Sequence, residues 1–350
     1  MLFDLNHFHA KFHHQSLGAF MNLGKFRLSI TGIALAIFLP ANLLFTSNLM
    51  AQDYPTKPIK ILVGYAPGGA VDLVARTLGQ SISTPLGQSI VIENKPGAGS
   101  NIAVKQLIDS PPDGYTLMVA ANALAANMSL YKPQPFDIDK DITPIAMIGR
   151  VPVVLAVSAE SKYQKLSDLI SAAKANPDFI TYGTPGNGGA PHMAMKLFEQ
   201  SSGITLKQIP YKGGAPAITD LIGGQLDLVA VNMLEIAPHA KSGKLKIVAV
   251  MSAKRSPIFP EVSTVAESGF PGFEASVWYS LIAPAKTPAS IVKTLHAQVE
   301  KALQSKEMSE RLGSIGGEVS PGTTAQAASF LNSERRRYEK LVREANIKPD

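Results

Sequence analysis

The chain has 350 residues, a formal net charge of +6 and no cysteine. The lack of cysteine excludes a thiolate nucleophile, a cysteine-ligated metal, a disulfide framework and a lipid anchor attached through cysteine. Hydrophobic residues make up 45% of the chain and charged residues 17%, which is typical of a compact globular protein. The modest basic excess is spread along the sequence, so we expect no nucleic-acid partner.

The N-terminal segment has the layout of a secretory signal peptide. Residues 28–45 form an apolar run that follows Lys25 and Arg27. We predict a leader over residues 1–51, with export and cleavage near Ala51; a permanent membrane anchor is the alternative, and translation could start at Met21. Cleavage would remove three basic residues and one acidic residue and leave 299 residues with a net charge of +4. That length suits one large or two ordinary domains.

After the leader, short runs rich in β-branched residues alternate with segments of helical period. The alternation predicts an α/β architecture with mainly parallel sheets. The last segment, 323–345, is predicted to be a long helix with Phe330 and Tyr338 on its apolar face. The charge run that begins at Glu334 is expected mostly on the solvated face of this helix. The expected strands are 59–65, 89–94, 115–120, 152–158, 179–183, 226–232, 245–251 and 277–283, and the expected helices include 70–82 and 289–304.

Two junctions between a strand and a helix are rich in glycine, at residues 67–69 (PGG) and 184–189 (TPGNGG). The first backbone N–H groups of a helix have no partner within the helix, and glycine lets another molecule approach them closely. The helix dipole adds positive potential, so each junction could hold an anion. A tight turn without a ligand is the alternative for each junction, but two similar loops favour a shared ligand. A third Gly-Gly pair stands at residues 213–214.

Motifs for nucleotides and for catalysis are missing. The glycine loops do not match G-x-x-x-x-G-K-[ST], and Pro191 stands where G-x-G-x-x-G would need its third glycine. We therefore expect no cofactor and no metal. There is no G-x-S-x-G or H-E-x-x-H motif, and His192 is better explained as a residue that orders its loop than as a general base. The rival interpretation is an exported α/β hydrolase that uses His192 with Ser129 or Ser158.

A succession of motifs runs from Tyr54 to the C-terminus: YPTKPIKILVGYAPGGAVD, IENKPGAGSNIA, PDGYTLMVA, NMSLYK followed by FDIDKDITPI, YGTPGNGGAPHMAMKLF, IPYKGGAPAITDLIGGQLD and GFPGFEASVWYSLIAPAKTP. This set resembles the Bug family of extracytoplasmic solute receptors, the binding subunits of tripartite tricarboxylate transporters. The resemblance implies a periplasmic protein without catalysis, with the two-domain Venus-flytrap fold of type II-like periplasmic binding proteins and a ligand cleft between the domains. By analogy, domain one combines residues 52–155 and 279–350, and domain two spans residues 156–278.

Members of this family characteristically hold a carboxylate through main-chain amides and hydroxyls of two loops, which map onto residues 65–72 and 184–192 here. The resemblance therefore points to the same junctions as the glycine pattern. It implies a monomeric receptor that passes a small carboxylate to membrane subunits of a tripartite transporter, with a role as a ligand sensor for signalling as an alternative. The candidate ligand-binding residues are Tyr65, Pro67, Gly68, Gly69, Ala70, Asp72, Asn122, Thr184, Gly186, Asn187, Gly188, Gly189, Ala190, His192 and Tyr211.

Two departures from the family pattern bear on the ligand. Ala190 follows the second loop where relatives often carry Ser or Thr, and residues 121–127 are poor in hydroxyl groups. We therefore expect a longer aliphatic or aromatic carboxylate rather than citrate. The role of Asp72 stays open between ordering the first turn and contacting an amino group or water of the ligand. Tyr65, Tyr211 and Trp278 could line the cleft or pack in the core.

Overall fold

The computed structural model describes residues 54–211 and 213–348, which belong to one compact unit. The predicted leader, its cleavage site and the alternative start lie outside the described residues. In the part of the chain that is described, no helix is long and apolar enough to span a bilayer. The helices are α1 (Ala70–Leu86), η1 (Ala98–Ser100, 3-10), α2 (Asn101–Ile108), α3 (Ala123–Leu130), α4 (Ile138–Asp141), α5 (Leu166–Ala175), α6 (Ala190–Ser202), α7 (Gly214–Ile222), α8 (Met233–Lys241), α9 (Ala289–Leu303), α10 (Lys306–Ser314) and α11 (Thr324–Glu344).

The strands form one continuous set in the order β2-β1-β3-β9-β4-β7-β5-β6, and β8 and β10 also pair with β4. The pairs β2-β1, β1-β3, β7-β5 and β5-β6 are parallel, whereas the pairs made by β4 and β9 are antiparallel. The strands are β1 (Ile59–Val63), β2 (Ile90–Asn94), β3 (Thr116–Ala120), β4 (Ile142–Ser158), β5 (Thr181–Thr184), β6 (Lys207–Pro210), β7 (Leu228–Asn232), β8 (Leu245–Val250), β9 (Ser276–Pro284) and β10 (Glu318–Val319).

The predicted α/β architecture is confirmed, but the prediction of mainly parallel sheets is wrong at β4 and β9. Apolar runs of this kind show that a strand is buried and do not show its direction. β4 also starts at Ile142, ten residues before the predicted strand. Pro144 and Gly149 interrupt the apolar pattern there, and both lie at shifts in the register with β9. Irregular pairing of this kind tolerates residues that a regular strand disfavours.

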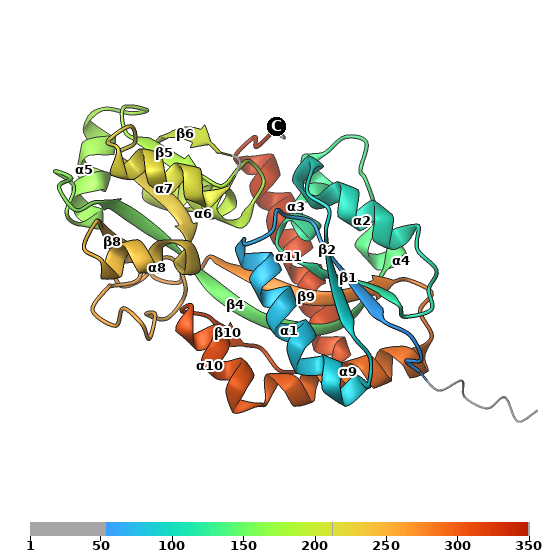
Figure 1. Ribbon diagram of the computed structural model, residues 1–350. Helices are drawn as coiled ribbons and strands as arrows, with labels where there is room; N and C mark the ends of the chain where they lie inside the picture. The colour runs from blue at the N-terminus through green and yellow to red at the C-terminus, as the bar shows by residue number, and fades with distance from the viewer. Residues whose placement is uncertain (1–53, 212, 349–350) are drawn as a thin grey trace, which may run out of the picture. The chain divides into compact units, whose positions relative to one another are not determined.

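The long strand β4 connects two groups of strands (Figure 1). Its residues 142–152 pair with β9, and its residues 153–156 pair with β7. The parallel strands β1, β2 and β3 therefore belong to one group, and the parallel strands β5, β6 and β7 belong to the other. Because parallel strands end at the same edge of a sheet, each group presents one edge of strand-to-helix loops.

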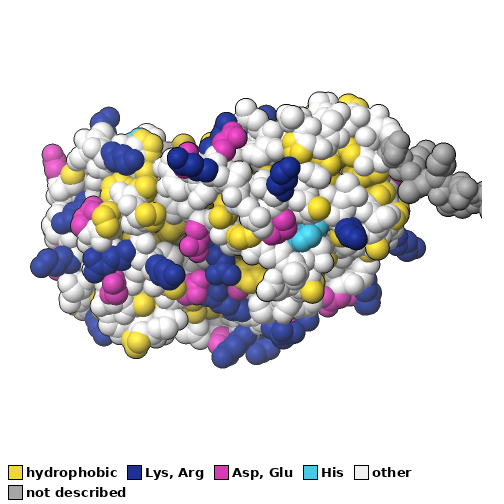
Figure 2. All heavy atoms as spheres, turned by 90° about the horizontal axis from the view of Figure 1, so that it is seen from below, with side chains coloured by type: hydrophobic (Ala, Val, Ile, Leu, Met, Phe, Trp, Pro, Cys, Tyr) yellow, Lys and Arg dark blue, Asp and Glu magenta, His cyan; other side chains and the backbone are white. Residues whose placement is uncertain are grey.

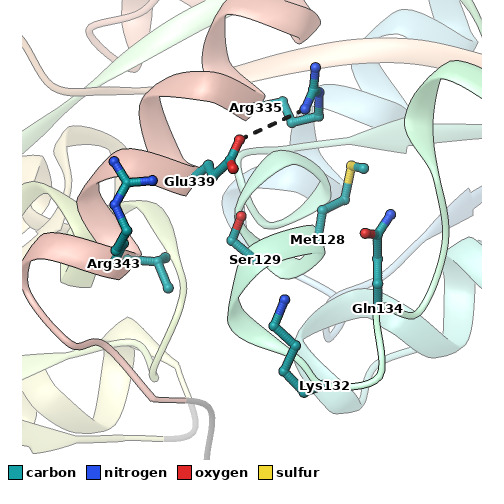
Figure 3. A pocket seen from close by; sticks show the side chains of 8 residues that line it. Met128, Ser129, Lys132, Gln134, Arg335, Glu339 and Arg343 are labelled. Atoms are coloured by element: carbon teal, nitrogen blue, oxygen red, sulfur yellow. Dashed lines mark ion pairs between the residues drawn. The ribbon is translucent and has the colours of Figure 1, made fainter.

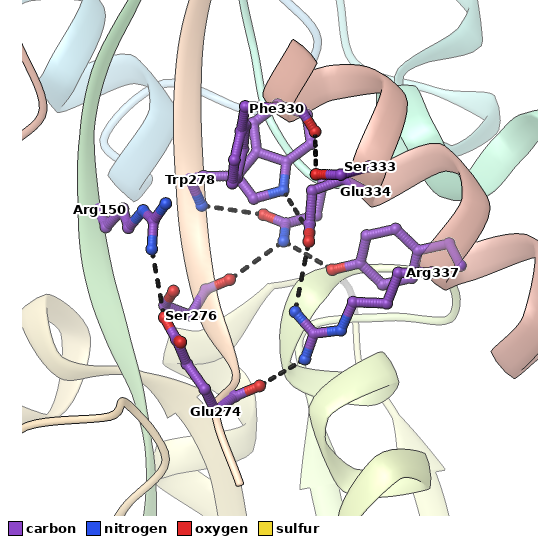
Figure 4. Close-up of polar contacts among 10 residues, drawn as sticks. Arg150, Glu274, Ser276, Trp278, Phe330, Ser333, Glu334 and Arg337 are labelled. Atoms are coloured by element: carbon purple, nitrogen blue, oxygen red, sulfur yellow. Dashed lines mark hydrogen bonds and ion pairs between the residues drawn. The ribbon is translucent and has the colours of Figure 1, made fainter. Parts of the chain in front are cut away.

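A buried polar network joins β9, α11 and the loop after β3 (Figure 4). The indole Nε1 of Trp278 donates to Glu334 Oε2 at 2.9 Å, and its backbone N–H donates to Asn122 Oδ1 at 3.1 Å. Asn122 Nδ2 donates to the Ser276 carbonyl at 3.0 Å and to Tyr338 Oη at 2.7 Å. Three chain segments that are far apart in the sequence are thus held together, and Trp278 belongs to the core rather than to a cleft wall.

The expectation that the charge run on α11 is solvated is wrong for Glu334, which is only 6% exposed. Glu334 lies three residues after Leu331 and four before Tyr338, so helical spacing places it on the buried face. Arg337 pairs with its carboxylate at 3.3 Å and also donates to the backbone carbonyl of Glu274. A buried carboxylate is tolerated here because each of its oxygens has a donor.

We expect Glu334→Ala to destabilise the fold by about 1–3 kcal/mol, because the buried indole N–H of Trp278 would lose its acceptor. The free energy of unfolding from urea denaturation measures this loss. Glu310→Ala on α10 is the matched control, since its side chain is 65% exposed and should change the free energy by less than about 0.5 kcal/mol. Equal effects of the two substitutions would contradict a structural role for Glu334.

Candidate functional site

Both predicted glycine turns lie at carboxyl ends of parallel strands. The first turn connects β1 to α1, and the second connects β5 to α6. In open α/β sheets, ligands bind outside the carboxyl ends of the strands, where helix N-termini point toward the ligand. The predicted turns therefore occupy the edge of each strand group at which a ligand is expected.

The first turn is fixed by Asp72, the third residue of α1. Its Oδ2 accepts hydrogen bonds from the Gly68 backbone N–H and from Arg76 Nε, both at 2.9 Å. Its Oδ1 accepts from Asn94 Nδ2 at 2.9 Å, and Asn94 also donates to the Tyr65 carbonyl at 3.0 Å. Burial opposes ionisation, but these hydrogen bonds and the charge of Arg76 lower the pKa of Asp72 below its usual range. Asp72 therefore orders the turn as a carboxylate.

The second turn is fixed in the same way by His192, the third residue of α6. Its Nδ1 accepts a hydrogen bond from the Gly188 backbone N–H at 3.0 Å. Burial and the neighbouring charge of Lys196 lower the pKa of His192 to about 4, so the ring is neutral near pH 7. Gly68 and Gly188 both have positive φ, of 82° and 70°, and each lies four residues before its acceptor. The two turns thus share one construction.

Polar side chains also hold the rest of the second loop. Gln208 Nε2 on β6 donates to Thr184 Oγ1 at 2.9 Å and to Asn187 Oδ1 at 2.8 Å. Thr184 is fully buried, and its hydroxyl donates to the Gly186 carbonyl at 3.3 Å. In this conformation the Thr184 hydroxyl therefore makes its hydrogen bonds to the loop and to β6.

The third Gly-Gly pair is filled by a carboxylate of the protein itself. A Cβ placed on Gly214 would lie 2.6 Å from Glu235 Oε1, so the Glu235 side chain occupies the start of α7. The nearby Tyr211 has its Oη bonded to Asp220 Oδ2 at 2.6 Å. Burial, followed by this bond to Asp220, raises the pKa of Tyr211 to about 12. The third turn shows that a side-chain carboxyl group can occupy the N-terminus of an α-helix in this protein, although burial raises the pKa of Glu235.

The helix-capping glycines of the first two turns, Gly69 and Gly189, have no such neighbour. Their φ angles of −77° and −70° suit any residue. A Cβ on Gly69 would meet only the Ala66 carbonyl, at 3.5 Å, and a Cβ on Gly189 would meet only Pro191 Cδ, at 3.9 Å. Neither the backbone nor the packing of the described residues therefore requires glycine at these two positions.

The first N–H groups of α1 and α6 are also available as donors. No side chain caps either helix by a hydrogen bond from its N-cap position. Within residues 54–211 and 213–348, the backbone N–H groups of Ala70, Val71 and Ala190 have no hydrogen-bond acceptor. Both helices thus combine unpaired backbone donors with a capping glycine whose Cβ position is unoccupied.

A continuous run of contacts leads from the first turn to the second. A Cβ on Gly64 would overlap Ser100 Oγ at 1.8 Å, so the first turn packs tightly against η1. Asn127 on α3 donates to the Gly99 carbonyl of η1 at 2.7 Å, and its Oδ1 lies 3.9 Å from the Cβ position of Gly188. The two turns are therefore connected through η1 and α3.

Sequence reasoning missed three side chains that position the turns: Asn94, Asn127 and Gln208. Asn94 is the last residue of a predicted strand, and a polar residue at the carboxyl end of a strand is the signal that could have identified it. Gln208 lies on β6 (KQIP), a strand that the sequence did not predict because Ile209 is its one β-branched residue and no apolar run marks it. Asn122, in contrast, was predicted to bind ligand, but it is 1% exposed and both its N–H groups donate within the β9 and α11 network. Its contact with a ligand stays a prediction.

Residues 74–347 match the family described as the tripartite tricarboxylate transporter family receptor. The chain belongs to this family. Protein BugT of Bordetella pertussis is 36% identical over 300 residues, which cover 85% of this chain and 92% of BugT. The rival hydrolase interpretation is therefore rejected, since the family consists of solute-binding receptors and His192 is already engaged with its own loop.

Two solved structures of Rhodopseudomonas palustris receptors share the fold. Rpa4515 with adipate is 33% identical with a TM-score of 0.79, and the match covers 85% of this chain and 100% of Rpa4515. MatC with bound malate is 30% identical with a TM-score of 0.75, and the match covers 83% of this chain and 100% of MatC. The structure of the periplasmic binding protein BugD, 32% identical with a TM-score of 0.77, confirms the predicted periplasmic binding protein fold. Together with the family match, it shows that the protein is a periplasmic solute-binding receptor.

The pKa of His192 predicts a pH dependence of stability. Because this pKa is about 4 in the fold and 6.5 ordinarily, the unfolded chain binds more protons between these values. The stabilisation is complete above pH 6.5 and is lost as the pH falls toward 4. Asparagine in His192→Asn keeps an acceptor but does not titrate. When the pH falls, we therefore expect this variant to lose less unfolding free energy than the wild type, with a difference on the order of 1–3 kcal/mol.

Urea denaturation at about pH 7 and about pH 4.5 measures this difference. His239→Asn is the control for replacing a histidine elsewhere in the fold. An identical loss in wild type and His192→Asn would show that His192 is not held neutral by the fold.

Proposed function

We propose that this receptor captures a small carboxylate through the backbone N–H groups at the starts of α1 and α6 and delivers it to the membrane subunits of a tripartite tricarboxylate transporter. The observation that carries the proposal is the pair of capping glycines, Gly69 and Gly189, which the protein itself does not require. Glycine at these positions leaves room for a ligand to reach the free N–H groups. The relatives crystallised with adipate and malate support a carboxylate as the ligand.

The chemistry is sufficient without a salt bridge to the ligand. Hydrogen bonds to a charged group contribute roughly 1.5–3 kcal/mol each, and helix dipoles add about 0.3–1 kcal/mol. Micromolar binding requires about 8 kcal/mol after the entropic cost of association. Three or four backbone donors therefore supply a large part of the affinity, and burial of the ligand supplies the rest. Water can also replace the ligand as the hydrogen-bond acceptor of these amides when the ligand must be released.

Closure of two domains around the ligand follows from this proposal. The division expected from the family places residues 52–155 and 279–350 in one domain and residues 156–278 in the other. The pairing of β4 supports it, because β4 changes partners from β9 to β7 between Pro152 and Val153. We expect the change of angle to occur where β4 passes from one strand group to the other. The same reasoning places the network around Trp278 beside the hinge.

The partners expected for such a receptor are its ligand and the transporter subunits, and the protein is expected to act as a monomer in the periplasm. Figure 2 shows one face of the molecule, on which lysine and arginine side chains are interspersed with acidic and hydrophobic ones. A nucleic-acid-binding face would instead gather basic side chains in a stripe or patch. A role as a ligand sensor remains the alternative to uptake.

A panel of acids tests the class of ligand. We expect longer aliphatic or aromatic carboxylates to raise the thermal unfolding temperature of the leader-free protein more than citrate does, because the segment 121–127 offers few hydroxyl groups. Thermal shift measurements with unbranched dicarboxylates, benzoates and citrate provide the ranking. The expectation is wrong if only small polyhydroxy acids stabilise the protein.

Substitution of the capping glycines tests the mode of binding. We expect Gly69→Ala and Gly189→Ala each to weaken the best ligand of that panel by about tenfold or more, because the new methyl group stands in front of the free N–H groups. Stability should change by no more than about 1 kcal/mol, since both positions accept a side chain. Titration calorimetry measures the affinity.

Gly313→Ala is the matched control for these substitutions. Gly313 lies on α10, has no positive φ and has nothing within 4 Å of its Cβ position. Its substitution should leave affinity unchanged. Unchanged affinity in Gly69→Ala and Gly189→Ala as well would remove the support that the capping glycines give to the proposal.

A further inference from the structure

A cavity of about 390 Å³ lies between α3 and α11, and its residues are not part of the glycine turns. Figure 3 shows Met128, Ser129 and Lys132 on the α3 side and Arg335, Glu339 and Arg343 on α11. The volume falls in the range of pockets that hold small organic molecules.

Positive charge predominates around this cavity. Lys132, Arg335 and Arg343 line it together with a single carboxylate, that of Glu339. Among residues 54–211 and 213–348, Lys132 and Arg343 have no carboxylate within ion-pair distance. Two cations at the cavity are therefore uncompensated by the described residues.

Arg335 is also weakly paired. Its Nη1 lies 3.9 Å from Glu339 Oε2 and its Nη2 lies 3.9 Å from Asp139 Oδ2, both too long for a hydrogen bond. Its Nε is buried and has no acceptor among the described residues. Guanidinium groups bind carboxylate and phosphate oxygens through paired N–H donors, so Arg335 retains capacity for an anionic guest.

The rest of the lining adds an apolar component. Met128 and Val342 are each 8% exposed and form part of the cavity wall. Such a wall suits hydrocarbon better than a fully hydrated inorganic ion. We propose that this pocket is a second ligand site, which binds a small organic anion with a carboxylate or phosphate group and a short apolar body.

This pocket and the second glycine turn lie on different faces of α3. Asn127 and Leu130 face Gly188 of the turn, whereas Met128 and Ser129 line the cavity. Binding in the pocket does not require that the glycine turns bind a carboxylate. The two sites can therefore be tested separately in one sample.

NMR of the leader-free protein separates the sites. The Met128 methyl group reports on the pocket, and the backbone amide of Ala190, the first residue of α6 after Gly189, reports on the second turn. With glutarate as the probe at low ionic strength, we expect a saturable shift of the Met128 methyl signal. That signal is assigned from its loss in Met128→Leu. Inorganic phosphate, which lacks an apolar body, should bind more weakly.

Variants decide whether the shift belongs to this pocket. Arg335→Gln and Arg343→Gln should each raise the half-saturating glutarate concentration at Met128 by about tenfold or more, without changing any response of the Ala190 amide. Arg311→Gln on α10, where Arg311 pairs with Glu307 at 2.9 Å, is the charge-matched control and should leave it unchanged. The proposal is overturned if Met128 does not respond to glutarate or responds equally in all three variants. A response of the Ala190 amide alone would support the glycine turns and refute this pocket.

Discussion

The backbone donors at the start of an α-helix have no partner within the helix, and this constraint governs the site that we propose for the receptor. Most proteins satisfy these donors with a capping side chain, as Thr323 does for α11, whose Oγ1 accepts from Gln326 N–H at 3.1 Å. At α1 and α6 the capping residue is glycine, which offers no acceptor. We propose that a ligand carboxylate supplies the missing acceptors at both helices.

The surrounding residues make such a site rigid while keeping it free of uncompensated negative charge. Asp72 and His192 occupy the same position in their helices and each accept one N–H from a glycine of the preceding turn. The charge of Asp72 is paired with Arg76 at 2.9 Å, and His192 is neutral near pH 7. A turn that is already ordered costs less entropy when the ligand binds, because fewer groups remain to be fixed. At the start of α7, the corresponding space beside Gly214 is occupied by the Glu235 side chain of the protein itself.

The sequence predicted the local elements well because each has a local signal. Helix period identified α1, α9 and α11 within a few residues, and glycine placement identified both turns. Strand direction could not be predicted, since the buried runs of β4 and β9 look alike in parallel and antiparallel pairs. The roles of Glu334 and Asn122 were also out of reach, because their partners lie on elements 56 and 156 residues away in the chain. The strand β6, which carries Gln208, has the sequence KQIP and lacks the apolar, β-branched run by which the other strands were detected.

Backbone amide NMR of the protein during titration with its carboxylate ligand tests the central claim most directly. The account predicts that the amide protons of Ala70, Val71 and Ala190 move downfield together and saturate at one ligand concentration, as expected for donors to a single anion. Shifts confined to one helix start, or a bound ligand that leaves these three amides unchanged, would contradict it.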